Sequence, residues 1–380
     1  MPDACTEKFT VEGREVCIVD ESIAPPAFKR LLISLIRTAL GSNKYVARFV
    51  RLRVVLKNAA IIDPEKPRHW LTKAVELSAG STLGFCSSEE FVKSPEAPTI
   101  NLVVDSIFGH SLAGENQNEI ELLSEKELQR MVAKRLSNKL VETIKHEMLH
   151  LAQFQQKRYA EKHVRWFALA NKMIERNERA SPFGVESSFS HARFYLTFLT
   201  HNVWCEGLAR MFERLQSYDS VTSAEYYFEA TDSAQRISGA FMKWKTEVYE
   251  WLSAQKDARR FPLKGGHSMR ILKCLNSLVK ATTGMYQVFH RESYSLGLHM
   301  VYKIAYSYQI GPEDIEPYID KYLQLNRREL FKLYEEACAQ NNMRPVFSFS
   351  SNAGILDYSR MVNELEQLAE QCGIRQNVQK

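Results

Sequence analysis

Hydrophobic and polar positions follow two different periods along the 380 residues of the chain. Before residue 124, short apolar stretches alternate with turn residues, as they do in half-buried strands joined by tight connections. From residue 124 onward, apolar positions recur at helical spacing over most of the remaining length. The pattern therefore predicts an α+β protein in two parts, an N-terminal α+β lobe over 1–123 and a largely helical lobe over 124–380.

The N-terminal lobe combines strand patterns with one clear helix. The 9–19 stretch reads as two short strands around a turn at Gly13, and 45–56 alternates and is rich in valine, as expected of a strand. Between them, 28–40 has the spacing of an amphipathic helix, which Gly41 is expected to end.

The helical lobe begins at a capping box, Ser124-Glu125-Lys126-Glu127, in which the serine and the second glutamate would satisfy the first backbone N–H groups. Stretches rich in glycine and proline then divide the lobe into separate helices. These stretches lie at 181–184, 261–266, 311–312 and 345–354.

Composition and charge place the chain among globular proteins. It is 45% hydrophobic, 25% charged and 11% aromatic, which excludes a disordered chain, and its net charge of +5 neither requires nor excludes a nucleic-acid partner. The first residues lack the apolar stretch of a secretory signal, and no run is long enough to span a bilayer. We therefore expect no membrane partner.

The cysteines indicate a reducing environment. They are odd in number and never in CxxC spacing, so neither a disulfide framework nor a zinc ribbon is expected, and the chain is predicted to be cytoplasmic. The seven cysteines are Cys5, Cys17, Cys86, Cys205, Cys274, Cys338 and Cys372.

The stretch Lys145-His146-Glu147-Met148-Leu149-His150 sets two histidines four residues apart in a helical pattern. Residues at this spacing lie one above the other on a helix, so both imidazoles can bind one ion. An apolar stripe runs beside them, at Leu136, Leu140, Ile144, Met148 and Leu151. The HExxH order resembles the signature of the zincin metallopeptidases. The resemblance implies Zn²⁺ held by His146 and His150, with Glu147 as the general base that takes a proton from a metal-bound water.

The resemblance also implies a zincin-like fold, with the HExxH helix at the junction of the two lobes. Zincins place a sheet edge along the substrate cleft, and the strand predicted over 99–105 comes shortly before the helix. We expect this strand at the edge, where it would pair with an extended peptide through main-chain hydrogen bonds. An ordinary interior strand is the alternative.

Catalytic zinc usually has three protein ligands, and the third is expected at Glu206. The string Glu206-Gly207-Leu208-Ala209 resembles the second motif of the gluzincins, in which a helical glutamate followed by small residues completes a His-His-Glu site. Gly207 and Ala209 would let this helix approach the HExxH helix closely. Arg210, one turn beyond Glu206, would orient its carboxylate.

His163 is an alternative third ligand. With the residues 164–167 after it, it resembles the third histidine of Spartan-like proteases, which digest DNA–protein crosslinks. The chain departs from that pattern because Val164 replaces the usual glycine and no cysteine ribbon follows. Further candidates for the third ligand are Glu213, His201 and His191.

Helical rise limits which of these residues can reach the histidines. If the HExxH helix continued as far as the turn at 181–184, the residue opposite His150 on a returning helix would lie near Gln216, and Glu206 would miss the histidines by about 15 Å. We therefore predict that the HExxH helix ends within about two turns of His150, soon after Gln155 or Gln156, although no helix-breaking residue is visible there.

A later stretch supplies candidates for stabilising the transition state. In gluzincins a tyrosine or histidine from a later helix commonly steadies the oxyanion, and the resemblance points to Tyr294 and His299, with Arg291 behind them. Gly297, on the same predicted helix face as Tyr294, invites the close approach of a neighbouring helix.

The sequence thus predicts a zinc metallopeptidase of gluzincin type, a hydrolase acting on a peptide or protein substrate. Its metal ligands would be His146, His150 and Glu206, and its catalytic residues Glu147, Tyr294 and His299. Two alternatives stay open, a Spartan-like protease acting on DNA-bound protein and a non-catalytic helical interaction protein with a degenerate zincin site.

Overall fold

The computed structural model of the chain describes residues 5–62, 67–77, 82–113, 125–156, 159–161, 163–165, 185–213, 223–260, 266–308, 310, 314–349 and 354–374. The chain divides into two compact units. Unit 1 holds Met1–Val164 with Phe212–Arg214, and unit 2 holds Arg165–Met211 with Leu215–Lys380. The predicted α+β class is confirmed, with a small N-terminal sheet and a helical C-terminal part.

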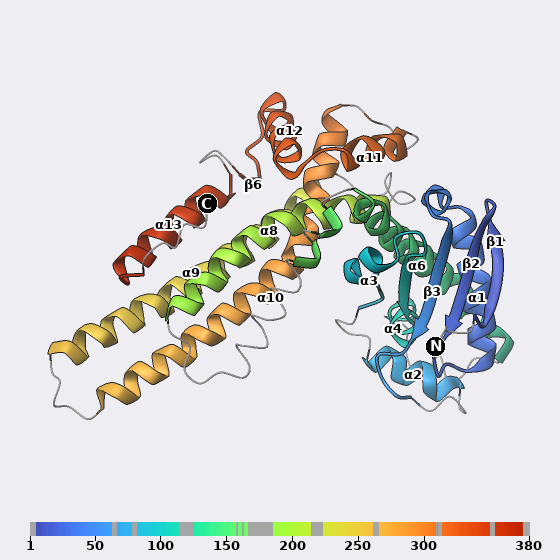
Figure 1. Cartoon of the computed structure of the whole chain (residues 1–380), viewed down its shortest axis with the longest axis horizontal. Coiled ribbons are helices and arrows are strands. Elements are labelled where there is room, and N and C mark those ends of the chain that lie inside the picture. The colour runs from blue at the N-terminus through green and yellow to red at the C-terminus, as the bar shows by residue number, and fades with distance from the viewer. Residues whose placement is uncertain are drawn as a thin grey trace. The chain divides into compact units, whose positions relative to one another are not determined.

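Unit 1 contains a five-stranded sheet (Figure 1) with the order β1-β2-β3-β5-β4. The strands are β1 (Glu7–Val11), β2 (Arg14–Asp20), β3 (Arg51–Lys57), β4 (Gly84–Cys86) and β5 (Thr99–Val103). The three central strands are parallel, and β1 and β4 pair antiparallel at the two edges. The hairpin predicted at Gly13 is confirmed: Glu12 and Gly13 have φ values of 47° and 76°, the positive values that a two-residue turn between twisted strands requires.

Three helices meet in an aromatic core beside this sheet. They are α1 (Pro26–Gly41), which confirms the predicted amphipathic helix, α2 (Pro67–Leu77) and α4 (Val104–Ser111). The Phe28 ring lies 5.9 Å from Trp70 and 5.3 Å from Phe108, and all three side chains are buried. Aromatic rings at these distances add specific edge and face contacts to the large area they bury.

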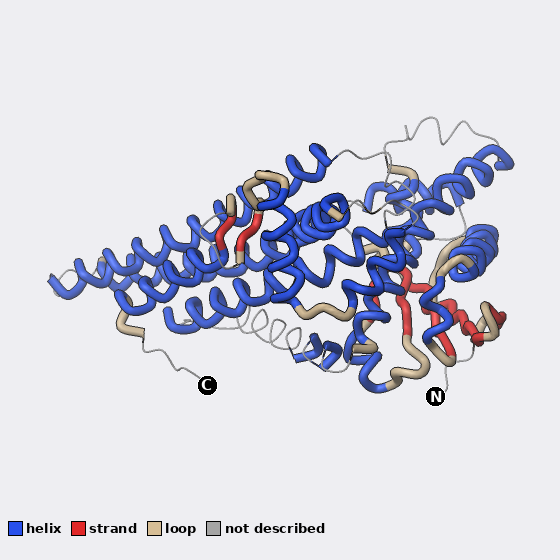
Figure 2. Tube along the Cα trace, turned by 90° about the horizontal axis from the view of Figure 1, so that it is seen from above, coloured by secondary structure: helices blue, strands red, loops and turns tan. Residues whose placement is uncertain are grey.

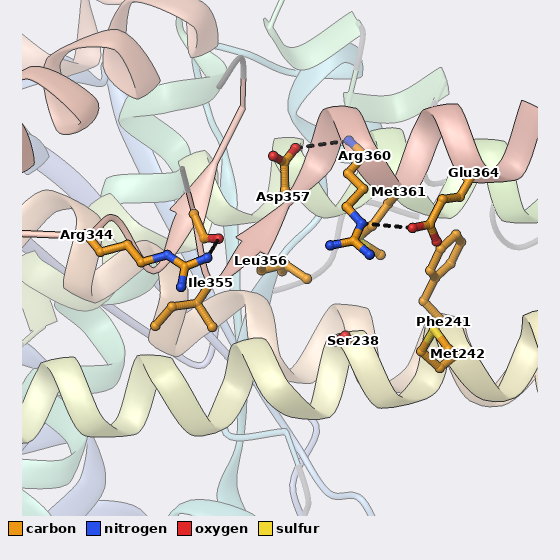
Figure 3. A pocket seen from close by; sticks show the side chains of 11 residues that line it. Ser238, Phe241, Met242, Arg344, Ile355, Leu356, Asp357, Arg360, Met361 and Glu364 are labelled. Carbon is orange, nitrogen blue, oxygen red and sulfur yellow. Dashed lines mark hydrogen bonds and ion pairs between the residues drawn. The ribbon is translucent and has the colours of Figure 1, made fainter. Parts of the chain in front are cut away.

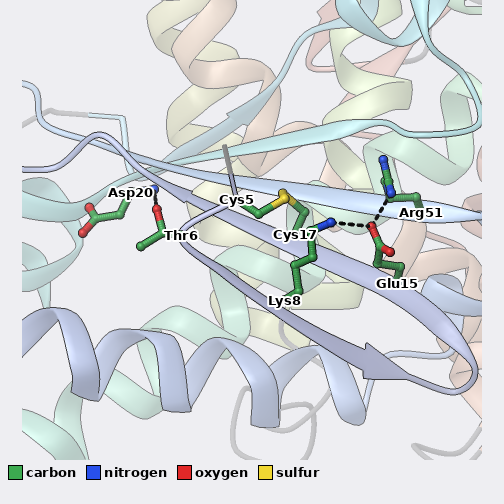
Figure 4. The surroundings of a disulfide bond; sticks show 7 residues. All are labelled: Cys5, Thr6, Lys8, Glu15, Cys17, Asp20 and Arg51. Atoms are coloured by element: carbon green, nitrogen blue, oxygen red, sulfur yellow. Dashed lines mark hydrogen bonds and ion pairs between the residues drawn. A yellow bond between two sulfur atoms is a disulfide. The ribbon is translucent and has the colours of Figure 1, made fainter. Parts of the chain in front are cut away.

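Cys5 and Cys17 form a disulfide (Figure 4), so the expectation of unpaired cysteines is wrong for this pair. The bond ties Cys5, two residues before β1, to the middle of β2. Cys17 lies on one face of the sheet with Val19 and Val55, and the three form a buried apolar cluster against which Cys5 packs. The other five cysteines, all within the described residues, form no disulfide.

Two strand predictions need correction. The 45–56 stretch is not one strand, because Lys44–Arg48 forms a short 3₁₀ helix that the side chain of Asn43 caps before β3 begins. The 99–105 stretch is not the sheet edge, because β5 pairs with β3 on one side and with β4 on the other. The edge strand is β4, from a turn-rich stretch in which the sequence shows no strand pattern.

The predicted lobe boundary at 123 also shifts. The HExxH helix, α6 (Glu125–Phe154), belongs to unit 1, where it packs against α1, α4 and β4. Its predicted capping residue Ser124 lies outside the described residues, as do the turns expected at 181–184 and 311–312 and most of the one at 261–266.

Unit 2 is mostly helical, with a small sheet of two parallel strands, β6 (Phe347–Ser348) and β7 (Leu356–Asp357). Its helices are α8 (Val185–Glu213, whose last two residues belong to unit 1), α9 (Ser223–Arg260), α10 (His267–Ser307), α11 (Ile315–Leu323), α12 (Arg327–Gln340) and α13 (Tyr358–Gln371). Helices α9 and α10 run side by side along most of their length (Figures 1 and 2). A buried hydrogen-bond network joins α8, α9 and α10: Trp244 donates to Ser188 Oγ at 2.9 Å, and Ser188 Oγ lies 2.8 Å from Thr282 Oγ1. None of the described helices is both long enough and apolar enough to cross a membrane.

Candidate metal centre

Helix α6 ends within two turns of His150, as the predicted metal site requires. Its apolar stripe is fully buried, so the helix is held along one side by unit 1. The helix stops at Phe154, one turn after His150, and the next amides tighten the end: Gln155 N–H donates to Leu151 O and Gln156 N–H to Gln153 O. The predicted early end of the HExxH helix is confirmed.

His146 and His150 face one another with their Nε2 atoms 3.0 Å apart. The other ring nitrogens are occupied: His150 Nδ1 donates to Gln153 Oε1 at 2.8 Å, and His146 Nδ1 donates to the Glu213 carboxylate at 3.2 Å. An amide oxygen and a carboxylate only accept, so both protons of the neutral rings sit on Nδ1. The two Nε2 lone pairs then point toward each other, an arrangement that repels unless a cation lies between them.

Glu206 joins the two histidines. One ligand atom from each of His146, His150 and Glu206 lies within 4.8 Å of the others, and the group can hold a metal ion. Helix α8 carries both Glu206 and Glu213, which are two turns apart and therefore on the same face. One helix thus supplies the carboxylate of the group and the carboxylate that orients His146.

Gly207 has a different neighbour from the one expected. A Cβ at Gly207 would lie 2.5 Å from the backbone of Gly297, and a Cβ at Gly297 would collide with Val203 O and the backbone of Gly207. Helices α8 and α10 therefore cross in backbone contact, so Gly207 admits α10 rather than the HExxH helix. The close packing predicted for Gly297 is confirmed.

Glu147 lies beside the edge strand β4. It is buried, and a Cβ at Gly84 would meet Thr143 Cγ2 at 2.9 Å and Glu147 Cγ at 3.4 Å. Cys86 Sγ donates to the backbone oxygen of Glu147 at 3.7 Å. The side chain predicted as general base therefore packs under the sheet edge, and glycine is the residue that leaves it room.

Tyr294 and His299, the two candidates for stabilising the transition state, have different neighbours in the structure. The Tyr294 ring lies 5.1 Å from the Arg210 guanidinium, one turn beyond Glu206 on α8. His299 has other neighbours: its buried ring packs against Tyr227 on α9 and Tyr334 on α12. It lies two residues beyond Gly297 and so on a different side of α10 from the helix crossing, and the catalytic role expected of it stays a prediction.

His290 is a neighbour of the site that the sequence did not single out. It sits one turn before Tyr294, with ring centroids 5.8 Å apart. Burial lowers the pKa of His290, and the nearby Glu206 carboxylate partly offsets this by favouring the charged ring. The available signal was its spacing, since His290, Tyr294 and Gly297 recur at helical intervals along one face.

The alternative third ligands have other surroundings. The His163 ring stacks on Tyr159 at 5.6 Å and lies 5.2 Å from Phe154, so it caps the end of α6 as an aromatic contact. His191 Nδ1 lies 3.3 Å from Ser187 Oγ, and the His201 ring lies near Trp204. Among the described residues, the metal-competent group contains Glu206 and none of these three histidines.

Comparisons with protein-family models, with curated proteins and with solved structures returned no match for this chain. The function must therefore be argued from the site. What the site offers is a largely buried His-His-Glu group able to hold a metal ion, and Glu147, which is also buried, follows His146 on α6.

Proposed function

We propose that the chain is a zinc-dependent metallopeptidase of gluzincin type with a zincin-like fold. The observation that carries the proposal is the facing pair of Nε2 atoms on His146 and His150, 3.0 Å apart, with Glu206 completing the group. Two imidazoles and one carboxylate are a ligand set that suits catalytic zinc, which keeps a fourth position for water or substrate. Bound there, zinc would supply a Lewis acid that lowers the pKa of water toward neutrality and polarises a carbonyl.

The chain's own residues divide the remaining work. Glu147, a buried glutamate on the α6 turn that carries both histidines, would take a proton from the attacking water and pass it to the leaving amine. Gln153 and Glu213 hold the two histidines in the tautomer that presents Nε2. His290 and Tyr294, on the α10 face toward Glu206, are the groups we assign to hydrogen-bonding the substrate oxygen.

The edge of β4 offers a place for an extended peptide. Val103 N–H donates to Leu83 O at 2.8 Å, which makes Leu83 and Val103 a hydrogen-bonded pair of the antiparallel ladder. Pairs alternate along such a ladder, so the N–H and C=O groups of Gly84 and Cys86 point away from β5. A substrate strand would add to this edge beside Glu147 by main-chain hydrogen bonds.

Metal analysis combined with one substitution tests the proposal. Purified protein should contain about one zinc ion per chain and cleave unfolded protein or peptide substrates, and Glu147→Gln should keep the zinc while losing activity by about 10³-fold or more. The matched control is Glu142→Gln, one turn earlier on α6 and only partly buried. Activity that survives Glu147→Gln would contradict the mechanism.

The other two functions predict different results in the same experiment. A non-catalytic interaction protein would contain no stoichiometric metal. A Spartan-like protease would lose zinc on His163→Ala and bind DNA in a salt-dependent way. Because His163 packs on Phe154 and Tyr159, we expect His163→Ala to keep its zinc.

A further inference from the structure

The edge strand β4 carries an exposed aromatic side chain at its centre. Phe85 is 41% exposed, whereas Asn101, the residue it pairs with on β5, is 1% exposed. The Lys57 Nζ lies 5.9 Å from the centroid of the Phe85 ring, a distance at which an ammonium is attracted to the face of a ring. A large part of an aromatic surface is therefore open at the strand to which a substrate peptide would add.

Phe85 points to the face of the sheet opposite the HExxH helix. A Cβ at Gly84 would meet Thr143 and Glu147 of α6, and Cys86 Sγ donates to the backbone oxygen of Glu147. Both neighbours of Phe85 thus face α6. Since side chains alternate along a strand, the Phe85 ring lies on the other face. One short strand therefore brings Glu147 to one side of an added peptide and an aromatic ring to its other side.

The pairing of β4 with β5 decides how a substrate residue would meet this ring. Leu83 and Val103 form a hydrogen-bonded pair, so Phe85, two residues later, also directs its backbone groups to β5. An antiparallel substrate strand would therefore bond to Gly84 and Cys86, and its residue opposite Phe85 would form a non-hydrogen-bonded pair. In such a pair the Cα atoms are only about 4.5 Å apart, and the side chains on the shared face touch.

We propose that Phe85 determines specificity in the proposed peptidase by selecting substrates with an aromatic side chain opposite it on the added strand. This inference rests on the proposed function. An aromatic pair across neighbouring strands is favoured over alanine by up to about fivefold in affinity. The selected side chain points away from α6, so it is not one of those that face the metal group.

Mass spectrometry of the products that the enzyme releases from a peptide mixture tests the preference. The wild type should cut about fivefold more often where one fixed position near the cut bond holds phenylalanine, tyrosine or tryptophan than where it holds alanine. Phe85→Ala should lose this preference because the cross-strand aromatic contact is gone, and its metal content should stay at the wild-type level. A preference that Phe85→Ala retains would overturn the assignment.

Phe85→Lys distinguishes a pairing role from a structural one. Opposite charges attract across neighbouring strands, so the same substrate position should change its preference from aromatic residues to aspartate and glutamate. A loss of folding cannot produce this change, and a preference that stays aromatic would contradict the proposal. The matched control is Met242→Ala, which should keep the wild-type preference. Met242 is 50% exposed and lines a pocket of unit 2 between α9 and the segment through β7 and α13 (Figure 3).

A binding measurement separates this inference from the proposed function. A fluorescein-labelled, threonine-rich octapeptide with one central phenylalanine should bind Glu147→Gln about fivefold more tightly than the same peptide with alanine there. Adding Phe85→Ala should remove the difference. If the wild type cuts no peptide but this difference is found, the peptidase activity is wrong and the selection by Phe85 stands. Equal binding of the two peptides to Glu147→Gln, or no binding of either, would overturn the selection.

Discussion

Helices α6 and α10 both bury histidines, yet they surround them differently. On α6, His150 is 8% exposed, donates from Nδ1 to Gln153 and turns Nε2 toward His146. On α10, His299 is 3% exposed, and its Nδ1 makes no hydrogen bond with any described residue. Its ring packs against Tyr227 and Tyr334 with centroids 5.7 Å and 5.8 Å away.

The difference shows that burial alone does not make a histidine a ligand. A polar partner at Nδ1 fixes the tautomer and aims the Nε2 lone pair, and this lowers the cost of holding a cation. A ring between tyrosines is held as an apolar group. Burial, with a smaller contribution from Lys303, lowers the pKa of His299 to about 4, so the ring stays neutral at physiological pH.

The largest expected effect on metal content comes from replacing His150 on α6, with the replacement of His299 on α10 as the comparison. His150→Ala leaves His146 and Glu206 as the remaining donors, so metal content should fall from about one ion per chain to near zero. His299→Phe should keep its metal, because the ring packs between Tyr227 and Tyr334, where phenylalanine can take its place. Elemental analysis of the two purified variants measures this, and metal loss in His299→Phe would remove the distinction between the helices.

The contribution of α10 to metal binding is expected to come through Gly297 rather than through His299. Gly297→Ala would place a methyl group against the backbone of Gly207 and push α8, with Glu206, away from α10. Overpacking against backbone on this scale should destabilise the fold by about 3 kcal/mol and weaken metal binding. Gly284→Ala is the matched control on the same helix, since a Cβ there meets nothing within 4 Å. Urea unfolding of both variants gives the comparison, and equal stabilities would show that the crossing can relax.

Lowering the pH should destabilise the folded protein through His299, the buried histidine of α10. Because the folded pKa of His299 lies near 4, below the 6.5 of an unfolded histidine, the unfolded chain takes up a proton first as pH falls. Above pH 6.5 the neutral ring therefore costs the folded state nothing. As the pH falls from 6.5 to about 4, the free energy of unfolding decreases by up to about 3 kcal/mol. His299→Phe should therefore lose less stability than the wild type over this interval in denaturant unfolding. Parallel losses in the two proteins would show that this ring does not titrate with unfolding.

The sequence predicts local features of the site well. The four-residue spacing of His146 and His150 follows from helix geometry, and the length argument correctly required α6 to end near Gln155. The short Glu206-Gly207-Leu208-Ala209 motif predicts Glu206 as a ligand, and the structure groups Glu206 with the two histidines. The fold class and the first hairpin also follow from residue patterns, because each depends on contacts close in sequence.

The features that the sequence did not predict depend on long-range packing. β4 has three residues and no alternation to detect, and it is an edge strand only because β5 lies between it and β3. Small residues such as Gly207 indicate a close approach but not which helix approaches, so the sequence points to α6 where the structure has α10. Tyr294 and His299 belong to one stretch of sequence, but the two residues point to different sides of α10.

The smallest effect should come from the carboxylate behind His146. Glu213 accepts the Nδ1 proton of that ring at 3.2 Å without belonging to the metal group itself. Glu213→Ala removes the orienting partner but leaves three donors, so zinc affinity should fall by about 10- to 100-fold, as replacing such partners usually does. Competition with a chromogenic chelator measures that affinity, and Glu186→Ala, an exposed glutamate at the start of the same helix, controls for the lost charge. If Glu213→Ala instead abolished metal binding as completely as His150→Ala, Glu213 would itself be a ligand. The metal group that distinguishes the histidines of α6 from His299 of α10 would then have four protein donors rather than three.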